Sequence, residues 1–188
     1  MTDVGVAFGI VFLAEIGDKT QLVALTTAGR HGAVKTLAAF AAAIALLQTI
    51  SVAAGSAVGS IFGGRAATAV VGGLFVVLGL WTWWSADGDE EEMPKGLGRA
   101  SLLGATGLFL LAELGDKTMI ATAALAAERS AVFVWLGSFA AMVAATGLAV
   151  VVGQQLVERL SGPRLARIGA VVFVAVGVIT IVNAIVGG

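Results

Sequence analysis

Six charged residues lie inside two stretches of sequence that are otherwise apolar. The stretches contain the related strings AEIGDKTQL at 14–22 and AELGDKTMI at 112–120. The charged residues are Glu15, Asp18 and Lys19 in the first string and Glu113, Asp116 and Lys117 in the second. A charge in the middle of a membrane costs on the order of 2.5–3.5 kcal/mol on insertion scales. These groups should therefore face one another, water or a ligand.

The spacing within each string favours binding of a hard cation. On a continuous helix, Glu and the Asp three residues later share a face, and the Lys stays close to it. The intervening Gly weakens the helix, so a break could expose carbonyl oxygens as further ligands. Two such faces would combine four carboxylates with the hydroxyls of Thr20 and Thr118. Oxygen ligands of this kind suit Mg²⁺, Ca²⁺ or Mn²⁺.

The charges of the two strings also predict exchange of a metal for protons. Four carboxylates and two lysines sum to −2, which one divalent cation neutralises. Four clustered carboxylates cannot all stay ionised in an empty site, so some should take up protons when the metal leaves. The alternative is that Glu–Lys pairs merely hold helices together. Two copies at matching depth favour the functional interpretation.

The composition is that of a polytopic membrane protein. Hydrophobic residues make up 59% of the 188 and charged residues 12%, against about 25% charged in ordinary globular domains. The net charge of −1 excludes a strongly basic nucleic-acid binder. With no Cys and only one His, His31, the chain offers no disulfide, thiolate nucleophile or soft zinc site.

Apolar length and loop punctuation predict six membrane-spanning helices. We expect spans at about 4–28, 35–60, 66–84, 101–126, 131–156 and 165–186. No basic residue precedes the first apolar run, so 4–28 is predicted to be a retained span rather than a cleaved signal. The run DGDEEE at 87–92 lacks the spacing of an EF-hand loop and is expected to be a solvated linker, with weak cation collection as the alternative.

The basic residues predict an orientation through the positive-inside rule. One face is expected to hold Arg30, Lys35, Lys95, Arg99, Arg159, Arg164 and Arg167, and the other Arg65 and Arg129. The more basic face should be cytoplasmic, which places both termini on the extracytoplasmic side of the cell's inner (plasma) membrane.

A shift of 98 residues aligns the two halves of the chain. It lays GIVFLAEIGDKTQLVALTTA over GLFLLAELGDKTMIATAALA with nine of twenty positions identical. The predicted organisation is a first three-helix repeat at 1–84, an acidic cytoplasmic linker at 85–100 and a second three-helix repeat at 101–188. Because three is odd, the second repeat must enter from the opposite side. The fold class is thus an all-α membrane protein of two inverted-topology repeats, as in many secondary transporters.

The doubled E-x-G-D-K-T motif in a six-span chain resembles the E-x-G-D-motif family of calcium/manganese–proton antiporters, whose bacterial branch exports manganese. The resemblance covers the whole chain. It implies that Glu15, Asp18, Glu113 and Asp116 bind the metal and couple it to protons. Thr20 and Thr118 would support them. Gln21 keeps the Gln that often follows the motif. Met119 departs from it, so either its thioether contacts the metal or, as we favour, that position does not ligate.

Two further polar residues occupy equivalent positions under the same shift. Gln48 and Thr146 could orient the carboxylates or line the pathway, or they could simply hydrogen-bond between helices. Ser51 and Ser138 are weaker candidates. Lys19 and Lys117 would tune the carboxylates and keep the site from attracting excess cations.

The predicted function is proton-coupled export of Mn²⁺, with Ca²⁺ next, and no cofactor. The alternatives are a divalent-cation channel with an acidic constriction and an exporter of a cationic amino acid. An intramembrane hydrolase using Asp18 and Asp116 is disfavoured, because a Lys adjoins each Asp and no segment gates a substrate. We therefore predict a transporter and not an enzyme.

Overall fold

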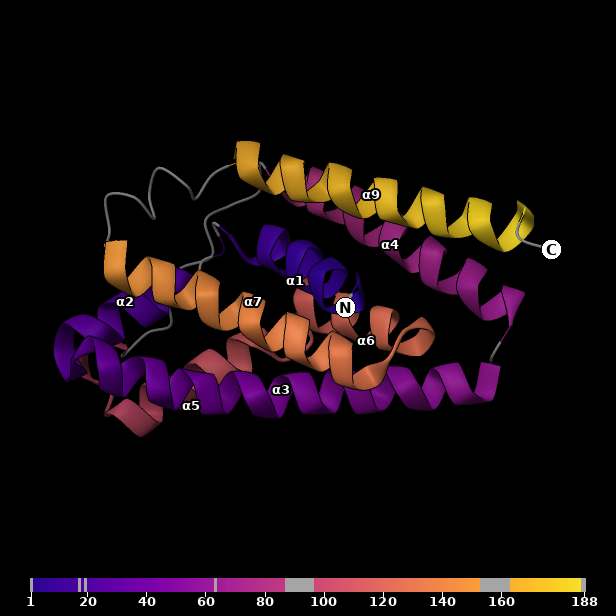
Figure 1. The fold of residues 1–188 in the computed structure, drawn as a ribbon. Helices are drawn as coiled ribbons and strands as arrows, with labels where there is room; N and C mark the ends of the chain where they lie inside the picture. The colour runs from indigo at the N-terminus through magenta and orange to yellow at the C-terminus, as the bar shows by residue number, and fades with distance from the viewer. Residues whose placement is uncertain are drawn as a thin grey trace.

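The computed structural model describes residues 2–16, 18, 20–62, 64–86, 97–152 and 163–186. For residues 62, 98 and 163–165 only the backbone is described. The described residues form helices and no strand. In chain order the elements are α1 (Thr2–Glu15), α2 (Thr20–His31), α3 (Ala33–Phe62), α4 (Arg65–Ser85), η1 (Leu97–Arg99), α5 (Leu102–Glu113), α6 (Lys117–Glu128), α7 (Ala131–Val152) and α9 (Pro163–Val186) (Figure 1).

Four of the described helices are long and apolar enough to cross a membrane, over 33–61, 65–85, 131–152 and 166–186. They correspond to four of the predicted spans. The longest, α3, has 30 residues and is about 45 Å long at 1.5 Å per residue. Helix α5 is shorter and also apolar. The described residues therefore confirm the expected all-α class with several helices apolar enough to span a membrane.

The other two predicted spans, 4–28 and 101–126, are each divided at the charged motif. The first consists of α1 and α2, and the second of α5 and α6. The expectation that Glu and Asp share one continuous helical face is therefore wrong. In each motif the Glu ends one helix, and the Asp precedes the next helix. In the second motif the left-handed Gly115 lies within the break, where glycine weakens a helix.

The helices of each half of the chain pack on helices of the other half, and the pattern is the same in both directions. Helix α1 packs on α7, and its counterpart α5 packs on α3. Helix α6 packs on α3, and its counterpart α2 packs on α7. Helices α4 and α9 pack on each other and run in opposite directions (Figure 1). At their contact Gly72 meets Gly177 and Gly79 meets Ala170, and the 98-residue shift converts one contact into the other.

Small residues bring the helix backbones close together. A Cβ atom on Gly55 would lie 2.0 Å from the Ala123 carbonyl oxygen, and one on Gly59 would lie 2.1 Å from that of Ala127. On the other side, a Cβ on Gly137 of α7 would lie 2.4 Å from the Val4 carbonyl oxygen of α1. Only glycine allows these approaches, as in other membrane helix interfaces.

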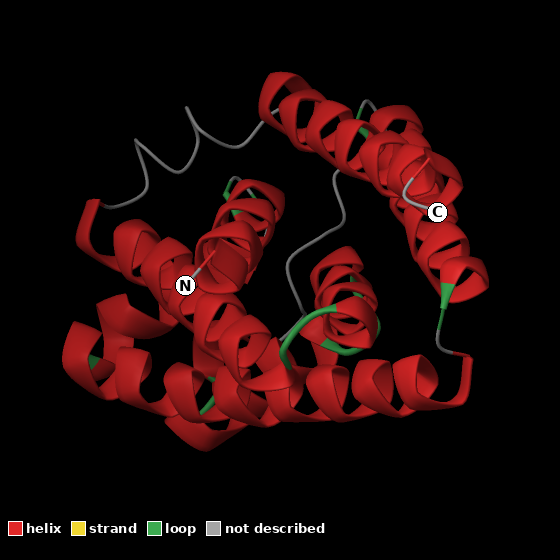
Figure 2. Ribbon diagram, turned by 45° about the vertical axis from the view of Figure 1, so that its right-hand side comes forward, coloured by secondary structure: helices red, strands yellow, loops and turns green. Residues whose placement is uncertain are grey.

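Two of the short helices that end or begin at the motifs, α1 and α6, lie inside the bundle. Figure 2 shows α1 and α6 surrounded by α3, α4, α7 and α9. These contacts agree with the packing of α1 on α7 and α9 and of α6 on α3 and α4. Stacked rings of Phe40 and Phe109, with centroids 4.3 Å apart, join α3 to α5. The packing buries the two motif glutamates, Glu15 and Glu113, which are 1% and 2% exposed.

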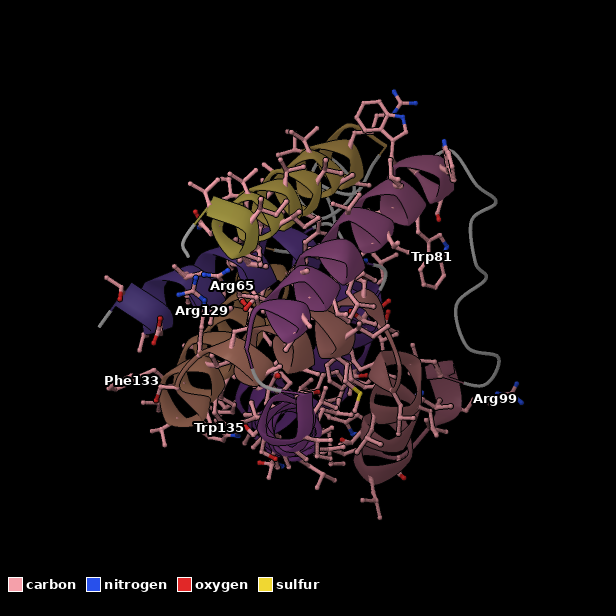
Figure 3. The ribbon with its side chains drawn as sticks, turned by 90° about the vertical axis from the view of Figure 1, so that its right-hand side faces the viewer. Arg65, Trp81, Arg99, Arg129, Phe133 and Trp135 are labelled. Atoms are coloured by element: carbon pink, nitrogen blue, oxygen red, sulfur yellow. The ribbon has the colours of Figure 1, made fainter. Side chains whose placement is uncertain are left out.

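The basic residues of the described part separate toward the two ends of the bundle. Figure 3 looks along the helices from the end where α3 turns into α4, and Arg65 and Arg129 lie at this end. Arg129 donates to Asp3 Oδ1 at 2.8 Å. At the other end the His31 ring lies 3.2 Å from the Ala100 carbonyl oxygen, beside Arg99. There Arg167 also lies over the Trp83 ring, 5.5 Å from its centroid.

Several sequence predictions fall outside the described residues. They include Gly17, Lys19, most of the acidic linker with Lys95, and the segment that contains Arg159.

Candidate functional site

The two helix breaks present carboxylates next to free helix ends. Glu15 is the last residue of α1 and Glu113 the last of α5. Asp116 is the N-cap of α6, where a negative charge is favourable near the exposed N–H groups of the first turn. Gly115 has φ +86°, a left-handed conformation that glycine adopts at little cost. The motif glycine therefore shapes the break between Glu113 and Asp116.

Glu15 is held by threonines from both motifs. Its side chain is 1% exposed. Oε1 accepts from Thr20 Oγ1 at 3.3 Å, and Oε2 accepts from Thr118 Oγ1 at 2.9 Å. The Thr118 hydroxyl also lies 3.4 Å from Asp116 Oδ2. The structure thus brings together two motifs that are about a hundred residues apart in the chain.

Lys117 supplies a second link between the motifs. Its ammonium donates to Asp18 Oδ2 and lies 3.9 Å from Asp116 Oδ2. The Lys117 ammonium therefore stands between an aspartate of the first motif and one of the second. A metal ion that bridged the two aspartates would have to displace this ammonium.

Glu113 differs from Glu15 although the motifs are nearly identical. It is 2% exposed, and its Oε1 has no hydrogen-bond partner. The carboxyl groups of Glu15, Asp18 and Asp116 are close enough to repel that of Glu113. One glutamate is therefore satisfied on both oxygens, whereas the other keeps an oxygen free.

The residues after each motif threonine explain part of this asymmetry. Gln21 Nε2 donates to the Glu15 carbonyl oxygen at 2.9 Å, which satisfies the end of α1. Met119 holds the equivalent position but has no donor. Its sulfur instead accepts from the Gly115 N–H at 3.4 Å.

Of the two predicted supporting residues, Gln48 lies at the site. Its Nε2 donates to Met142 Sδ at 2.8 Å, and it lines a small cavity together with Glu113. Thr146 is buried on α7, and the hydrogen bonds of the described residues include none from it to the motif carboxylates. Ser51 lines the same cavity as Gln48. Ser138 donates instead to carbonyl oxygens of its own helix.

Two cavities flank the motifs on opposite sides. The first borders the Asp18–Lys117 pair and reaches Thr82 of α4 and Ala166 of α9. The second borders Glu113 and is lined by Leu47, Gln48, Ser51, Met119 and Met142.

The carboxylates do not form a ready-made metal cage in this conformation. Within the described part of the chain, no three acidic or histidine side chains are arranged to hold one ion. Binding by Glu15, Asp18, Glu113 and Asp116 together stays a prediction, and it requires Lys117 to leave Asp18.

Met142 is the residue at this site that sequence reasoning missed. It lies in an apolar stretch of α7, 94 residues from Gln48, and no local pattern marks it as polar-facing. Its sulfur, among the mainly aliphatic and aromatic side chains of α7, was the only signal in the sequence.

Apolar spans interrupted at their centres by paired acidic and basic groups define a class of protein, a helical membrane transporter. The comparisons with known proteins identify it further. The family described as "Divalent cation/proton antiporter GDT1" matches residues 3–90 and 101–187. The chain belongs to this family, which consists of transporters and not enzymes.

Three relatives illustrate the similarity. The chain is 27% identical to "GDT1-like protein 3" of Oryza sativa subsp. indica, over 92% of this chain and 71% of the relative. It is 34% identical to "GDT1-like protein 1, chloroplastic" of Oryza sativa subsp. japonica, over 94% of this chain and 61% of the relative. It is 31% identical to "Protein PAM71, chloroplastic" of Arabidopsis thaliana, over 93% of this chain and 55% of the relative. No solved structure matches the chain.

Proposed function

We propose that this chain exports divalent metal cations from the cytoplasm in exchange for protons, with Mn²⁺ preferred and Ca²⁺ next. The observation that carries the proposal is the meeting of the two motifs. Thr118 of the second motif binds Glu15 of the first, and Lys117 pairs with Asp18. Acidic groups gathered in this way attract a cation, and they need protons or an internal cation when the metal is absent.

The proposed architecture has six membrane crossings in two inverted three-helix repeats, at 1–84 and 101–188, joined by the linker at 85–100. Each broken pair, α1–α2 and α5–α6, counts as one crossing. The exchanged packing of the two halves and the reciprocal glycine contacts between α4 and α9 support this proposal. The family model matches residues 3–90 and 101–187, and the gap between the two matches lies in the proposed linker.

In the proposed mechanism, a metal ion entering from the cytoplasm displaces the Lys117 ammonium from Asp18 and takes up carboxylate ligands from both motifs. Thr20 and Thr118 release Glu15 and support the bound ion. The two repeats then rock, so that the site opens outward, and incoming protons release the metal. The cavity from Asp18 to Thr82 and Ala166 is the proposed cytoplasmic approach.

The proposed orientation places both termini outside the plasma membrane. The gathering of Arg99 and Arg167 near one end, with Arg65 and Arg129 at the other, supports it.

The test uses purified protein in liposomes with an imposed pH gradient. Uptake of Mn²⁺ and Ca²⁺ is followed together with lumenal pH for wild type, Glu15→Gln and Glu113→Gln. We expect saturable metal flux with opposite proton flux, and a fall of about 100-fold or more in each variant, because each loses a metal ligand. Glu128→Gln, an exposed glutamate at the end of α6, is the matched control and should leave flux unchanged.

Other outcomes identify the alternatives. Flux that does not saturate and moves no protons would indicate a cation channel. Competition between lysine and Mn²⁺ would indicate an exporter of cationic amino acids. Full metal flux in both Gln variants would make the carboxylates structural and overturn the proposal.

A further inference from the structure

We propose that the cavity beside Glu113 is a selectivity subsite, in which the cation sheds water and meets three oxygens and two sulfurs. The oxygens belong to Glu113, Gln48 and Ser51, and the sulfurs to Met119 and Met142. For Met119 this is the thioether-contact alternative, in place of the non-ligating one favoured from the sequence. This ligand set favours Mn²⁺ over Ca²⁺. The inference rests on the proposed function and names which residues of the site choose the metal.

Three unpartnered oxygens carry the inference. Glu113 Oε1, Gln48 Oε1 and Ser51 Oγ are buried without a hydrogen-bond partner. Their residues are only 2%, 1% and 1% exposed, and all three line the same cavity. A buried polar atom without a partner costs roughly 1–3 kcal/mol. One cation in the cavity would satisfy all three oxygens at once.

The neighbouring helices hold these oxygens in place. Gln48 and Ser51 are three residues apart on α3 and so lie on one face. Because Gln48 Nε2 donates to Met142 Sδ, the amide oxygen is the atom left for a ligand. Helix α3 is pressed against α6 one turn beyond Ser51, where Gly55 meets the Ala123 backbone. This close contact fixes the position of α3 against α6 next to the cavity.

The two sulfurs make the cavity unsuitable for calcium. Ca²⁺ takes six to eight oxygen ligands, so the two sulfurs leave it short of donors. Mn²⁺ also prefers oxygen, but as a transition metal it accepts a thioether contact more readily than Ca²⁺ does. The Met119 sulfur is held by the Gly115 N–H and the Met142 sulfur by Gln48 Nε2. Each sulfur keeps a second lone pair, which could contact Mn²⁺.

The size of the cavity adds a second filter. It has room for about one water molecule. A hydrated ion cannot enter, so the metal must exchange most of its water for ligands from the walls. Mg²⁺, which dehydrates reluctantly, should be excluded.

The subsite occurs in only one half of the motif pair. Under the 98-residue shift, Met119 corresponds to Gln21 and Met142 to Ile44. Both oxygens of Glu15 are occupied by threonine hydroxyls, whereas Glu113 keeps one free. Replacing each methionine with its first-half counterpart is therefore a natural test.

The experiment measures Mn²⁺ binding to detergent-purified full-length protein by electron paramagnetic resonance, with Ca²⁺ as competitor. The variants are the double variant Met119→Gln with Met142→Ile, and Ser51→Ala. We expect the double variant to lower the ratio of Mn²⁺ to Ca²⁺ affinity by about tenfold, and Ser51→Ala to weaken Mn²⁺ binding several-fold. Met93→Leu, which removes a sulfur from the linker sequence, should change neither quantity.

The outcomes separate the inference from the proposed function. An unchanged affinity ratio in the double variant overturns the inference, even if liposomes show full proton-coupled Mn²⁺ flux. The expected binding results without proton-coupled flux in liposomes would support the subsite and overturn the proposed function. If the double variant does not fold, Ser51→Ala decides, because it removes only an unpartnered hydroxyl. Wild-type Mn²⁺ affinity in that variant would overturn the inference.

Discussion

At the scale of single residues, Lys117 is the side chain that links the aspartates of the two motifs. Its ammonium pairs with Asp18 of the other motif and lies 3.9 Å from Asp116. A metal that binds these aspartates must compete with a cation already attached to the protein. A tethered competitor of this kind would offset part of the negative charge of the empty site and prevent the metal from binding too tightly to be released.

Replacing Lys117 with Gln should therefore strengthen metal binding while slowing transport. We expect Mn²⁺ affinity to rise about tenfold, which corresponds to about 1.4 kcal/mol. The maximal Mn²⁺ flux should fall, because release no longer benefits from return of the ammonium to Asp18. Titration followed by electron paramagnetic resonance measures the Mn²⁺ affinity, and Mn²⁺ flux into liposomes measures the transport rate.

The control for this prediction is Arg129→Gln, which removes an ion pair with Asp3 at the end of the bundle and away from the motifs. It should leave Mn²⁺ affinity as in wild type. Weaker Mn²⁺ binding in Lys117→Gln would show that the ammonium organises the site and does not compete with the metal.

At the scale of elements, the site depends on how closely α3 approaches α6. The motif aspartate Asp116 caps α6, and Gln48 and Ser51 line the cavity from α3. Gly55 and Gly59 let the α3 and α6 backbones come close together, next to the cavity that Gln48 and Ser51 of α3 line with Met119 of α6. The interface thus positions the second motif against the residues that supply its additional oxygens.

Gly55→Ala should destabilise the protein by about 1–3 kcal/mol, because its Cβ would lie 2.0 Å from a backbone oxygen that cannot move alone. Gly73→Ala is the matched control. It also lies within a helix, but nothing lies within 4 Å of its added Cβ. This control should be neutral or stabilising by up to about 1 kcal/mol. Denaturant unfolding in mixed micelles, followed by circular dichroism, measures both. Equal stability of the two variants would contradict the close α3–α6 packing.

At the scale of the whole molecule, the distribution of charge predicts how the protein sits in its membrane. The Asp3–Arg129 ion pair and Arg65 lie at the end where α3 joins α4. The contacts of His31 and Arg167 with Ala100 and Trp83 lie at the opposite end, together with the start of η1. We expect the end with fewer basic residues to be extracytoplasmic.

Cysteine labelling tests this orientation without background, because the chain has no cysteine. Ser130→Cys, beside Arg129, should react with a membrane-impermeant maleimide in intact cells. Asp89→Cys, in the linker sequence, should react only after the cells are permeabilised. The reverse pattern would invert the topology, and export would then have to be reassigned as uptake.

The fold could be predicted from the sequence to the level of its spans. Long apolar runs dictate membrane helices regardless of their neighbours, because the bilayer offers backbone groups no other partner. The predicted spans 35–60 and 66–84 correspond to α3 and α4 within a few residues. The broken spans were harder to place, because a glycine inside an apolar run signals only a tendency to break.

The sequence by itself determined the membrane class, the doubled motif and the types of ligand available, because these follow from composition and local spacing. Only the tertiary structure decided which groups meet. It paired Lys117 with Asp18 across the motifs, gave Glu15 two threonine donors, and left Glu113 beside Gln48 and Met142. The physical reason is that these contacts join helices about a hundred residues apart. Their register depends on how small residues let the backbones approach, and no local pattern in the chain records that register.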